Sequence, residues 1–131
     1  MASIFTKIIQ GDIPCYKVAE TDDCIAFLDI RPLTKGHTLV VPKVEVDKLF
    51  DLPEAQYQAV MDLCQRVARA LEATMPCHRV GVAVLGFEVP HAHVHLVPLR
   101  NESELNFTNP KVQFTPEEMA SIAETIAAAL N

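Results

Sequence analysis

No stretch of about 18 consecutive apolar residues occurs in this sequence, so no segment is suited to cross a bilayer. Internal repeats and linkers rich in Gly or Ser are also missing, which at 131 residues favours a single domain over residues 1–131. Hydrophobic residues make up 50% of the chain and charged residues 21%, enough to bury a core. Intrinsic disorder, collagen-like repeats and low-complexity scaffolds are therefore excluded.

Basic side chains are few, because 11 Lys and Arg stand against 17 Asp and Glu, for a formal net charge of -6. Duplex nucleic acid and anionic membranes are bound by clustered Lys and Arg. We therefore expect neither nucleic acid nor a membrane as a partner. A small anionic ligand held by a few local groups remains compatible with this charge.

The cysteines form no C-x-x-C pair, and the N-terminus lacks the charged-then-apolar layout of a secretion signal. Both observations favour a cytoplasmic protein with reduced thiols that are buried as small apolar side chains. The cysteines concerned are Cys15, Cys24, Cys64 and Cys77.

Apolar residues at helical spacing predict three helices. A short one over residues 3–9 stops near Gly11, and the longest one begins near Pro53 and ends at Pro76. A C-terminal helix opens at Thr115-Pro116-Glu117-Glu118, which has the form of a capping box. The buried stripe of the longest helix is expected at Tyr57, Val60, Met61, Cys64, Val67, Ala68 and Leu71, and that of the C-terminal helix at Met119, Ile122, Ile126 and Leu130.

Strands are predicted between these helices. Residues 24–29 and 37–41 form an antiparallel pair, while the Val-rich residues 79–85 are typical of a buried strand. After a turn over residues 86–90, a further strand covers residues 91–99. Strands mixed with two substantial helices indicate an α+β fold.

The strand over residues 91–99 carries the most informative pattern of the sequence. Side chains alternate between the faces of a strand, so His91, His93 and His95 lie on one side. The intervening Ala92, Val94 and Leu96 lie on the other side, where they can pack against a helix. A row of imidazoles is poorly suited to an apolar core, because each ring nitrogen needs a hydrogen-bond partner.

Two chemical interpretations of the histidine row are open. Neutral imidazoles two residues apart on a strand can bind one metal ion, although only Cys77-His78 is available as an adjacent partner. Alternatively, one imidazole is a nucleophile in covalent catalysis and the others support it.

The histidine row, together with two upstream segments, resembles the histidine-triad (HIT) family of nucleotide hydrolases and transferases, and within it the Hint-like branch. The resemblance rests on residues 27–30 (FLDI), residues 36–43 (GHTLVVPK) and residues 91–97 (HAHVHLV), and the opening residues 4–14 are similar too. It spans roughly residues 3–100 and leaves residues 101–131 as a C-terminal extension with a helix. The family's fold is an antiparallel sheet of about five strands with a long helix and a C-terminal helix, and its members imply a homodimer.

The resemblance also implies roles for the histidines. His93 attacks the α-phosphorus of a nucleotide derivative, and His95 donates to a non-bridging oxygen as charge develops there. His37, in the upstream G-H-T segment, completes the polar cluster, and His91 orients its neighbours or lies on the leaving-group side. Neither a metal ion nor another cofactor is expected.

Nucleotide contacts are implied in the same way. Asp29 matches the carboxylate that accepts hydrogen bonds from the ribose hydroxyls. The alternative is an ordinary turn carboxylate at the end of a strand. The apolar walls around the base would be Ile4, Phe5, Ile8, Phe27 and Ile30, for which a plain core role is the alternative.

Two departures from the family pattern stand out. Relatives with a structural zinc carry C-x-x-C where this chain has Ser3 and Thr6, so no structural zinc is expected. Before the histidine row, Phe87 and Glu88 replace an amide and a small hydroxyl. A carboxylate repels phosphate unless it is protonated. Glu88 therefore points away, or it meets a cation carried by the substrate.

The sequence thus predicts hydrolysis of purine nucleoside phosphoramidates or related nucleotidyl esters through a nucleotidyl-His93 intermediate. Two rivals remain: a non-catalytic purine nucleotide-binding regulatory or interaction protein, and a metal protein that uses the histidine row as ligands.

Overall fold

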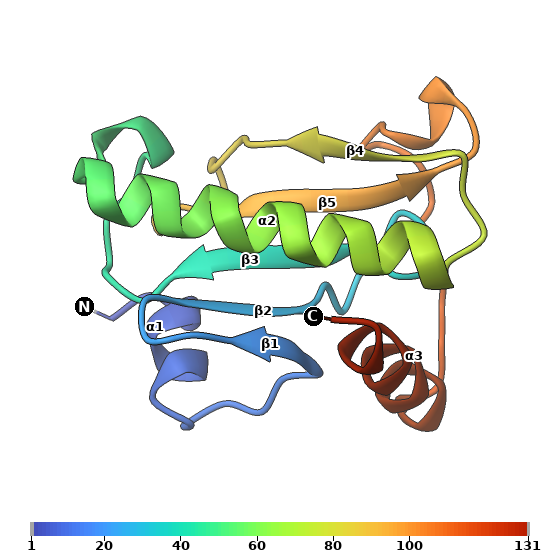
Figure 1. Ribbon diagram of the computed structural model, residues 1–131, viewed down its shortest axis with the longest axis horizontal. Coiled ribbons are helices and arrows are strands. Elements are labelled where there is room, and N and C mark those ends of the chain that lie inside the picture. Colours follow the sequence, from blue (N-terminus) through green and yellow to red (C-terminus); the bar gives the residue numbers. More distant parts are fainter. Residues whose placement is uncertain (1, 131) are drawn as a thin grey trace.

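The computed structural model describes residues 2–130, in which a five-stranded antiparallel sheet is accompanied by three α-helices (Figure 1). The strand order β1-β2-β3-β5-β4 places β4, rather than the last strand in sequence, at one edge. In chain order the elements are α1 (Ile4–Ile9), β1 (Lys17–Glu20), β2 (Cys24–Leu28), β3 (Thr38–Pro42), the 3-10 turn η1 (Leu49–Asp51), α2 (Glu54–Thr74), β4 (Arg79–Ala83), β5 (Val94–Leu99), η2 (Glu102–Glu104) and α3 (Pro116–Ala128).

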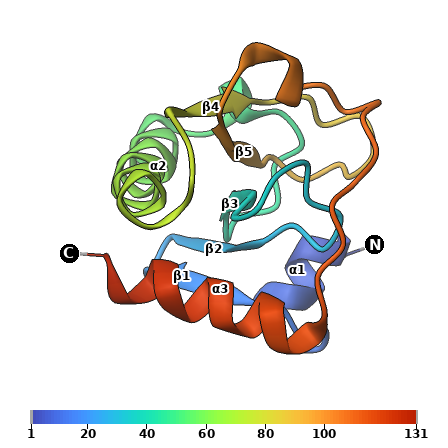
Figure 2. The ribbon, with the colours of Figure 1, turned by 90° about the vertical axis from the view of Figure 1, so that its right-hand side faces the viewer.

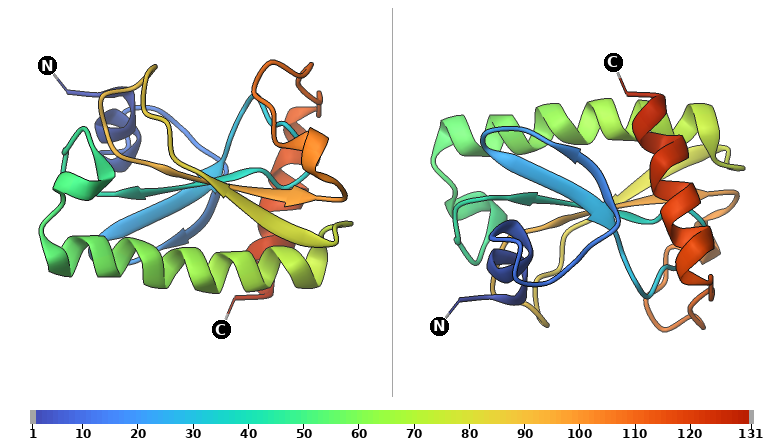
Figure 3. Two further views of the ribbon diagram at one scale, coloured as in Figure 1. Left: turned by 90° about the horizontal axis from the view of Figure 1, so that it is seen from above. Right: turned by 90° about the horizontal axis from the view of Figure 1, so that it is seen from below.

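Helices α2 and α3 pack on one face of the sheet and enclose the larger core. Figure 2 shows α2 on one side of the sheet and α1 on the other, and Figure 3 shows α3 crossing near the C-terminal end of α2. Buried residues at alternate strand positions supply the sheet side of this core, as the period of two requires. They include Ala26, Leu28, Val40, Val94 and Leu96.

The opposite face of the sheet is covered by two separate segments. At one end α1 brings Phe5 against Phe27 and Leu39, and at the other end Leu105 and Phe107 pack against Val97. Between these two covers the sheet is left accessible to a ligand.

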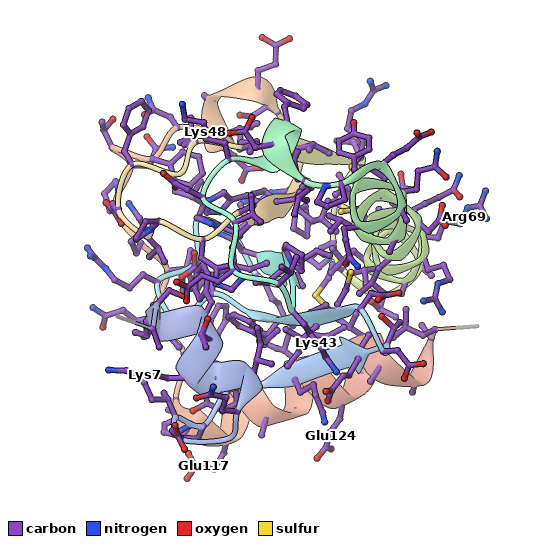
Figure 4. The ribbon with its side chains drawn as sticks, turned by 90° about the vertical axis from the view of Figure 1, so that its left-hand side faces the viewer. Lys7, Lys43, Lys48, Arg69, Glu117 and Glu124 are labelled. Carbon is purple, nitrogen blue, oxygen red and sulfur yellow. The ribbon has the colours of Figure 1, made fainter. Side chains whose placement is uncertain are left out.

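Helix α2 begins where the sequence predicts, with Pro53 as its N-cap residue. Its buried stripe differs in detail, because Leu63 and Ala70 are buried whereas Met61 is 37% exposed. The prediction that Met61 belongs to the buried stripe is therefore wrong, whereas its neighbour Val60 is buried. Charged residues occupy the outer faces of the helices, where Lys7, Arg69 and Glu124 point outward (Figure 4).

The predicted capping box of α3 is confirmed in the structure, and α1 also starts with a side-chain cap. The Thr115 hydroxyl of α3 accepts from the Glu118 N–H at 3.1 Å, and the Glu118 carboxylate accepts from the Thr115 N–H at 2.8 Å. This reciprocal pair is the capping box. Helix α1 starts with Ser3, whose hydroxyl accepts from the Thr6 N–H.

The strand predictions need three corrections. Strand β4 is an edge strand rather than a buried one, and Val82 is 55% exposed because only β5 lies beside it. Strand β5 begins at Val94, not at residue 91, because the Ala92 N–H donates to the Val46 carbonyl outside the sheet. Strand β1 was not predicted; it is short, its pairing with β2 shifts register, and only Val18 is buried.

Burial of the thiols is less complete than expected, since Cys24 and Cys64 are buried but Cys15 and Cys77 are only half-buried. All four are free. Within residues 2–130, no helix combines the length and the apolar character that a membrane crossing requires.

Candidate active site

The histidine row lies on the sheet face opposite α2, as the alternation predicts. The His93 ring is 5.0 Å from the His95 ring, and the Phe5 ring meets His93 edge-on at 4.9 Å. Ala92, Val94 and Leu96 enter the core on the other face. The row therefore presents imidazoles to the accessible part of the sheet while its apolar neighbours anchor the chain.

The tautomer of His93 is fixed by the backbone. Its Nδ1 lies 2.7 Å from the His91 carbonyl oxygen, and since a carbonyl can only accept, Nδ1 carries the proton. In the neutral ring the Nε2 atom then holds a lone pair. Burial lowers the pKa of His93, so the ring is neutral at pH 7. His93 thus presents an unprotonated nitrogen with a fixed direction.

A relay through two rings fixes His95. The Leu33 N–H donates to His37 Nδ1 at 3.0 Å, so the proton of neutral His37 is on Nε2. That Nε2–H donates to His95 Nδ1 at 3.0 Å, which leaves the His95 proton on its own Nε2. Burial lowers the pKa of both His37 and His95 to about 4. His95 is therefore a neutral hydrogen-bond donor.

His91 is buried behind His93. Its Nε2–H donates to the Pro42 carbonyl at 2.8 Å, and its Nδ1 accepts from the Ser3 hydroxyl at 2.7 Å. Both ring nitrogens are occupied by protein groups.

A cavity of about 530 Å³ lies above His93 and His95. Cross-strand register builds its floor, because Phe27 pairs with Leu39 and Leu39 with His95, which sets the three side chains in one row. All the residues expected to contact the nucleotide line the cavity: Ile4, Phe5, Ile8, Phe27, Asp29, Ile30 and Glu88.

His37 and His91 do not line the cavity, although they were expected among the catalytic residues. Both are essentially fully buried and reach it only through hydrogen bonds to His95 and His93. Their position suits them to orient rings rather than to touch a ligand. Of the two roles expected for His91, its burial favours the orientation of its neighbours over a place on the leaving-group side.

Asp29 is held at the cavity edge with one oxygen committed and the other available. Its Oδ1 accepts from the Arg31 N–H at 2.9 Å, while Oδ2 is 3.6 Å from His37 Nε2. Burial raises the pKa of this carboxyl above its ordinary value. A hydroxyl donor entering the cavity would offset part of that desolvation.

Among the cavity residues that were not predicted as site residues, Phe107 and Lys111 come from the C-terminal extension. Phe107 packs edge-on against His95, with ring centres 4.8 Å apart, and Lys111 also lines the cavity. The Lys111 ammonium donates to the carbonyls of Phe107 and Asn109 at 2.7 and 3.0 Å. No local pattern in residues 101–115 signals this role, which depends on where the segment folds back.

Cysteine offers no rival nucleophile in the cavity. Cys15 lines the wall, but burial raises its pKa, so the thiol stays protonated at neutral pH.

Three side chains near the edge of the cavity could in principle approach one metal ion. Among residues 2–130, the possible ligand atoms of Asp29, His37 and His95 lie within 4.8 Å of one another. A metal ion at His37 Nε2 would move the ring proton to Nδ1, where the Leu33 N–H already points. The relay that fixes His95 would also be lost. These residues therefore do not fit a metal ion in this arrangement.

Stability should fall as the pH drops from 7 to 5. His37 and His95 keep a pKa of about 4 when folded but regain the ordinary value of 6.5 when unfolded. Their contribution is complete above pH 6.5 and is lost below it, because the unfolded chain then binds protons that the folded chain refuses. With two such groups, we expect the free energy of unfolding to drop by about 2 kcal/mol per pH unit between pH 7 and 5 in urea titrations. A flat profile would contradict the neutral relay.

The fold and the site together define a class of protein, an α+β domain whose sheet presents backbone-oriented, neutral imidazoles to a small-ligand cavity. A family model described as "HIT domain" matches residues 10–102, and the chain belongs to this family. The α+β fold that the resemblance to this family implied is thereby confirmed.

Relatives support the same assignment. The chain is 38% identical over 130 residues to an adenosine 5'-monophosphoramidase of Schizosaccharomyces pombe, covering 97% of each sequence. Among solved structures, a HIT-like protein from Bartonella henselae has a TM-score of 0.84 at 31% identity, with 98% of this chain and 96% of that chain covered. A zinc-bound histidine triad family protein from Mycobacterium smegmatis has a TM-score of 0.81 at 31% identity, covering 98% and 93%.

Proposed function

We propose that this chain is a nucleotide phosphoramidase or nucleotidyl hydrolase that acts on purine nucleoside phosphoramidates or related nucleotidyl esters. The observation that carries the proposal is the fixed tautomer of His93. Its Nδ1–H is held by the His91 carbonyl, and its unprotonated Nε2 is the atom left to meet a ligand in the cavity. The activity of the fission-yeast relative supports the same reaction class.

The reaction runs in two displacements. His93 Nε2 attacks the α-phosphorus, the bond from phosphorus to the amine nitrogen breaks, and the amine leaves after taking a proton from water. The nucleotidyl-imidazole carries a positive charge, which the hydrogen bond from Nδ1–H to the His91 carbonyl stabilises. Water then attacks phosphorus, the bond to Nε2 breaks, and a nucleoside monophosphate is released.

His95 stabilises the charge that develops on phosphorus. It lies beside His93 and keeps its proton on Nε2 through the relay from Leu33 and His37. A neutral donor needs no proton transfer, so it can hold a non-bridging oxygen through both displacements. Removal of this donor is expected to slow both steps.

The nucleoside half of the substrate would occupy the apolar part of the cavity. Phe5 and Phe27 pack edge-on with ring centres 5.7 Å apart, and Ile4 and Ile8 extend this wall along α1. Such a wall suits a large flat base. Asp29 Oδ2 would accept from the ribose hydroxyls at the cavity edge.

The exposed mouth of the cavity favours a particular leaving group. Glu88 lines the cavity, and its negative charge acts to raise the pKa of His93. The opposite effect of burial on that pKa is larger. A carboxylate at this place disfavours additional phosphates and favours an amine that carries its own cation. We therefore include a basic leaving group in the proposal.

A second copy of this chain is the proposed protein partner. Strand β4 leaves one edge of the sheet unpaired among residues 2–130, and Val82, Val84 and Leu85 are exposed along it and the following loop. Unpaired edges with apolar side chains favour strand pairing with another chain. Sedimentation velocity on the purified chain separates dimer from monomer.

The test is to mix the chain with an adenosine phosphoramidate of a diamine and quench in alkali, which preserves phosphohistidine. We expect release of nucleoside monophosphate and a transient mass increase of one nucleotidyl group on the peptide that contains His93. The matched substrate with a neutral amine should react more slowly.

Nucleotide binding in calorimetry without product or adduct would instead identify the regulatory binding protein. Stoichiometric zinc that is lost with His91→Ala or His95→Ala would overturn the covalent mechanism.

A further inference from the structure

We propose that Ser3, the N-cap residue of α1, is a positioning residue of the active site and acts on His93 through His91. This inference rests on the proposed function, since it assigns a residue to the same reaction. Ser3 does not line the cavity, so it cannot touch the substrate. Its influence has to pass through hydrogen bonds.

The Ser3 hydroxyl lies where it can bond to both the helix and the histidine row. Its Oγ accepts from the Thr6 N–H at 3.0 Å and lies 2.7 Å from His91 Nδ1. Ser3 and His91 are 88 residues apart in sequence, and both are buried. A helix cap needs only the acceptor function, so the short contact with His91 is additional to capping.

The direction of this bond follows from its neighbours. His91 Nε2–H is held by the Pro42 carbonyl, so Nδ1 of the neutral ring must accept. The Thr6 hydroxyl donates its proton to Glu45, so this acceptor is already occupied and does not compete for the Ser3 proton. The nearer acceptor for the Ser3 proton is His91 Nδ1 at 2.7 Å, compared with Thr6 Oγ1 at 3.3 Å.

Glu45 keeps this arrangement in place from the loop after β3. Its Oε1 accepts from the Ser3 N–H at 2.8 Å as well as from the Thr6 hydroxyl. These two bonds lower the pKa of Glu45, so its carboxylate remains an acceptor at neutral pH. The start of α1 is thereby tied to the chain segment that precedes α2.

The consequence for catalysis concerns the His91 backbone. With its ring held at both nitrogens, His91 keeps its carbonyl oxygen 2.7 Å from His93 Nδ1. Without the Ser3 hydroxyl, the remaining partner of His91 Nδ1 is the Thr6 hydroxyl at 3.4 Å, whose proton is donated to Glu45. The ring is then held firmly at one end only. Misplacement of a reacting group by about 1 Å can lower the rate about 100-fold.

The experiment compares Ser3→Ala with Ser3→Thr. Ser3→Ala should lower kcat about tenfold or more and leave KM within about twofold. Ser3→Thr retains the hydroxyl and should restore most of kcat. Thr115→Ala is the matched control, because it removes an N-cap hydroxyl from α3, whose residues do not line the cavity. It should lower stability without lowering kcat.

A spectroscopic measurement separates this inference from the proposed function. In ¹⁵N-labelled protein, the His93 Nδ1–H resonance should exchange slowly with water, exchange faster in Ser3→Ala, and become slow again in Ser3→Thr. Unchanged exchange together with unchanged kcat in folded Ser3→Ala would overturn the role of Ser3. Absence of turnover in the wild-type chain would overturn the function alone, because the exchange readout needs no substrate.

Discussion

Alanine at position 93 should lower kcat by about 10⁴-fold or more and eliminate the nucleotidyl adduct. The expected loss is large because the covalent intermediate has no other site on which to form. His95 points its Nε2 proton, not a lone pair, toward the ligand. Both ring nitrogens of His91 are occupied by protein groups. Nucleotide affinity should change little, since the walls and Asp29 are untouched. Steady-state rates, adduct mass and calorimetry provide the three measurements.

His78→Ala is the matched control for this experiment. His78 is the one histidine outside the cluster, and its backbone N–H, which the substitution retains, donates to the Leu99 carbonyl. Its replacement should leave kcat and the adduct unchanged. Turnover by His93→Ala within about tenfold of the wild type would show that another group attacks phosphorus.

Alanine at position 36 should destabilise the protein by about 2–4 kcal/mol. Gly36 has a φ of +92°, in the region that side chains rarely adopt. A Cβ atom there would also lie 2.7 Å from Met75 Cγ and 2.9 Å from Met75 Sδ, closer than real contacts allow. Backbone strain and a clash therefore add at this position, directly before His37. Urea unfolding at pH 7 gives the free energy.

The chain offers a matched glycine that separates these two effects. Gly86 has a φ of +78°, but a Cβ atom there would meet nothing within 4 Å. Gly86→Ala should therefore cost only the strain, about 1 kcal/mol. In the Met75→Ala background, the additional cost of Gly36→Ala should fall toward that of Gly86→Ala. Equal losses for both glycines in the wild-type background would show that Met75 moves aside without cost.

Elements that depend on local chemistry were predictable from the sequence. The capping box at Thr115 and the start of α2 at Pro53 involve residues within one turn, and both are found as expected. Elements that depend on neighbours were not. Val82 belongs to a Val-rich run, yet its exposure follows from the position of β4 at the sheet edge, which no local pattern encodes.

The site divides in the same way. The period of two correctly grouped His91, His93 and His95 on one side of the chain, although only His95 lies within β5. Which ring meets the ligand and which supports it depends on the Leu33 N–H and the Pro42 carbonyl, main-chain groups that no pattern of side chains reveals. Lys111 and Phe107 reach the cavity only because residues 101–114 fold back over the sheet.

The backbone control of the three ring tautomers has a consequence for mutational tolerance. The donor at Leu33 and the acceptors at Pro42 and His91 belong to the main chain, so only proline at position 33 would delete one of them. A library of variants at positions 33 and 42 should therefore tolerate any residue that preserves the local path of the chain. Side chains around the nucleophile can therefore change without altering the tautomer of His93, provided that the Ser3 hydroxyl and the path of the main chain are kept.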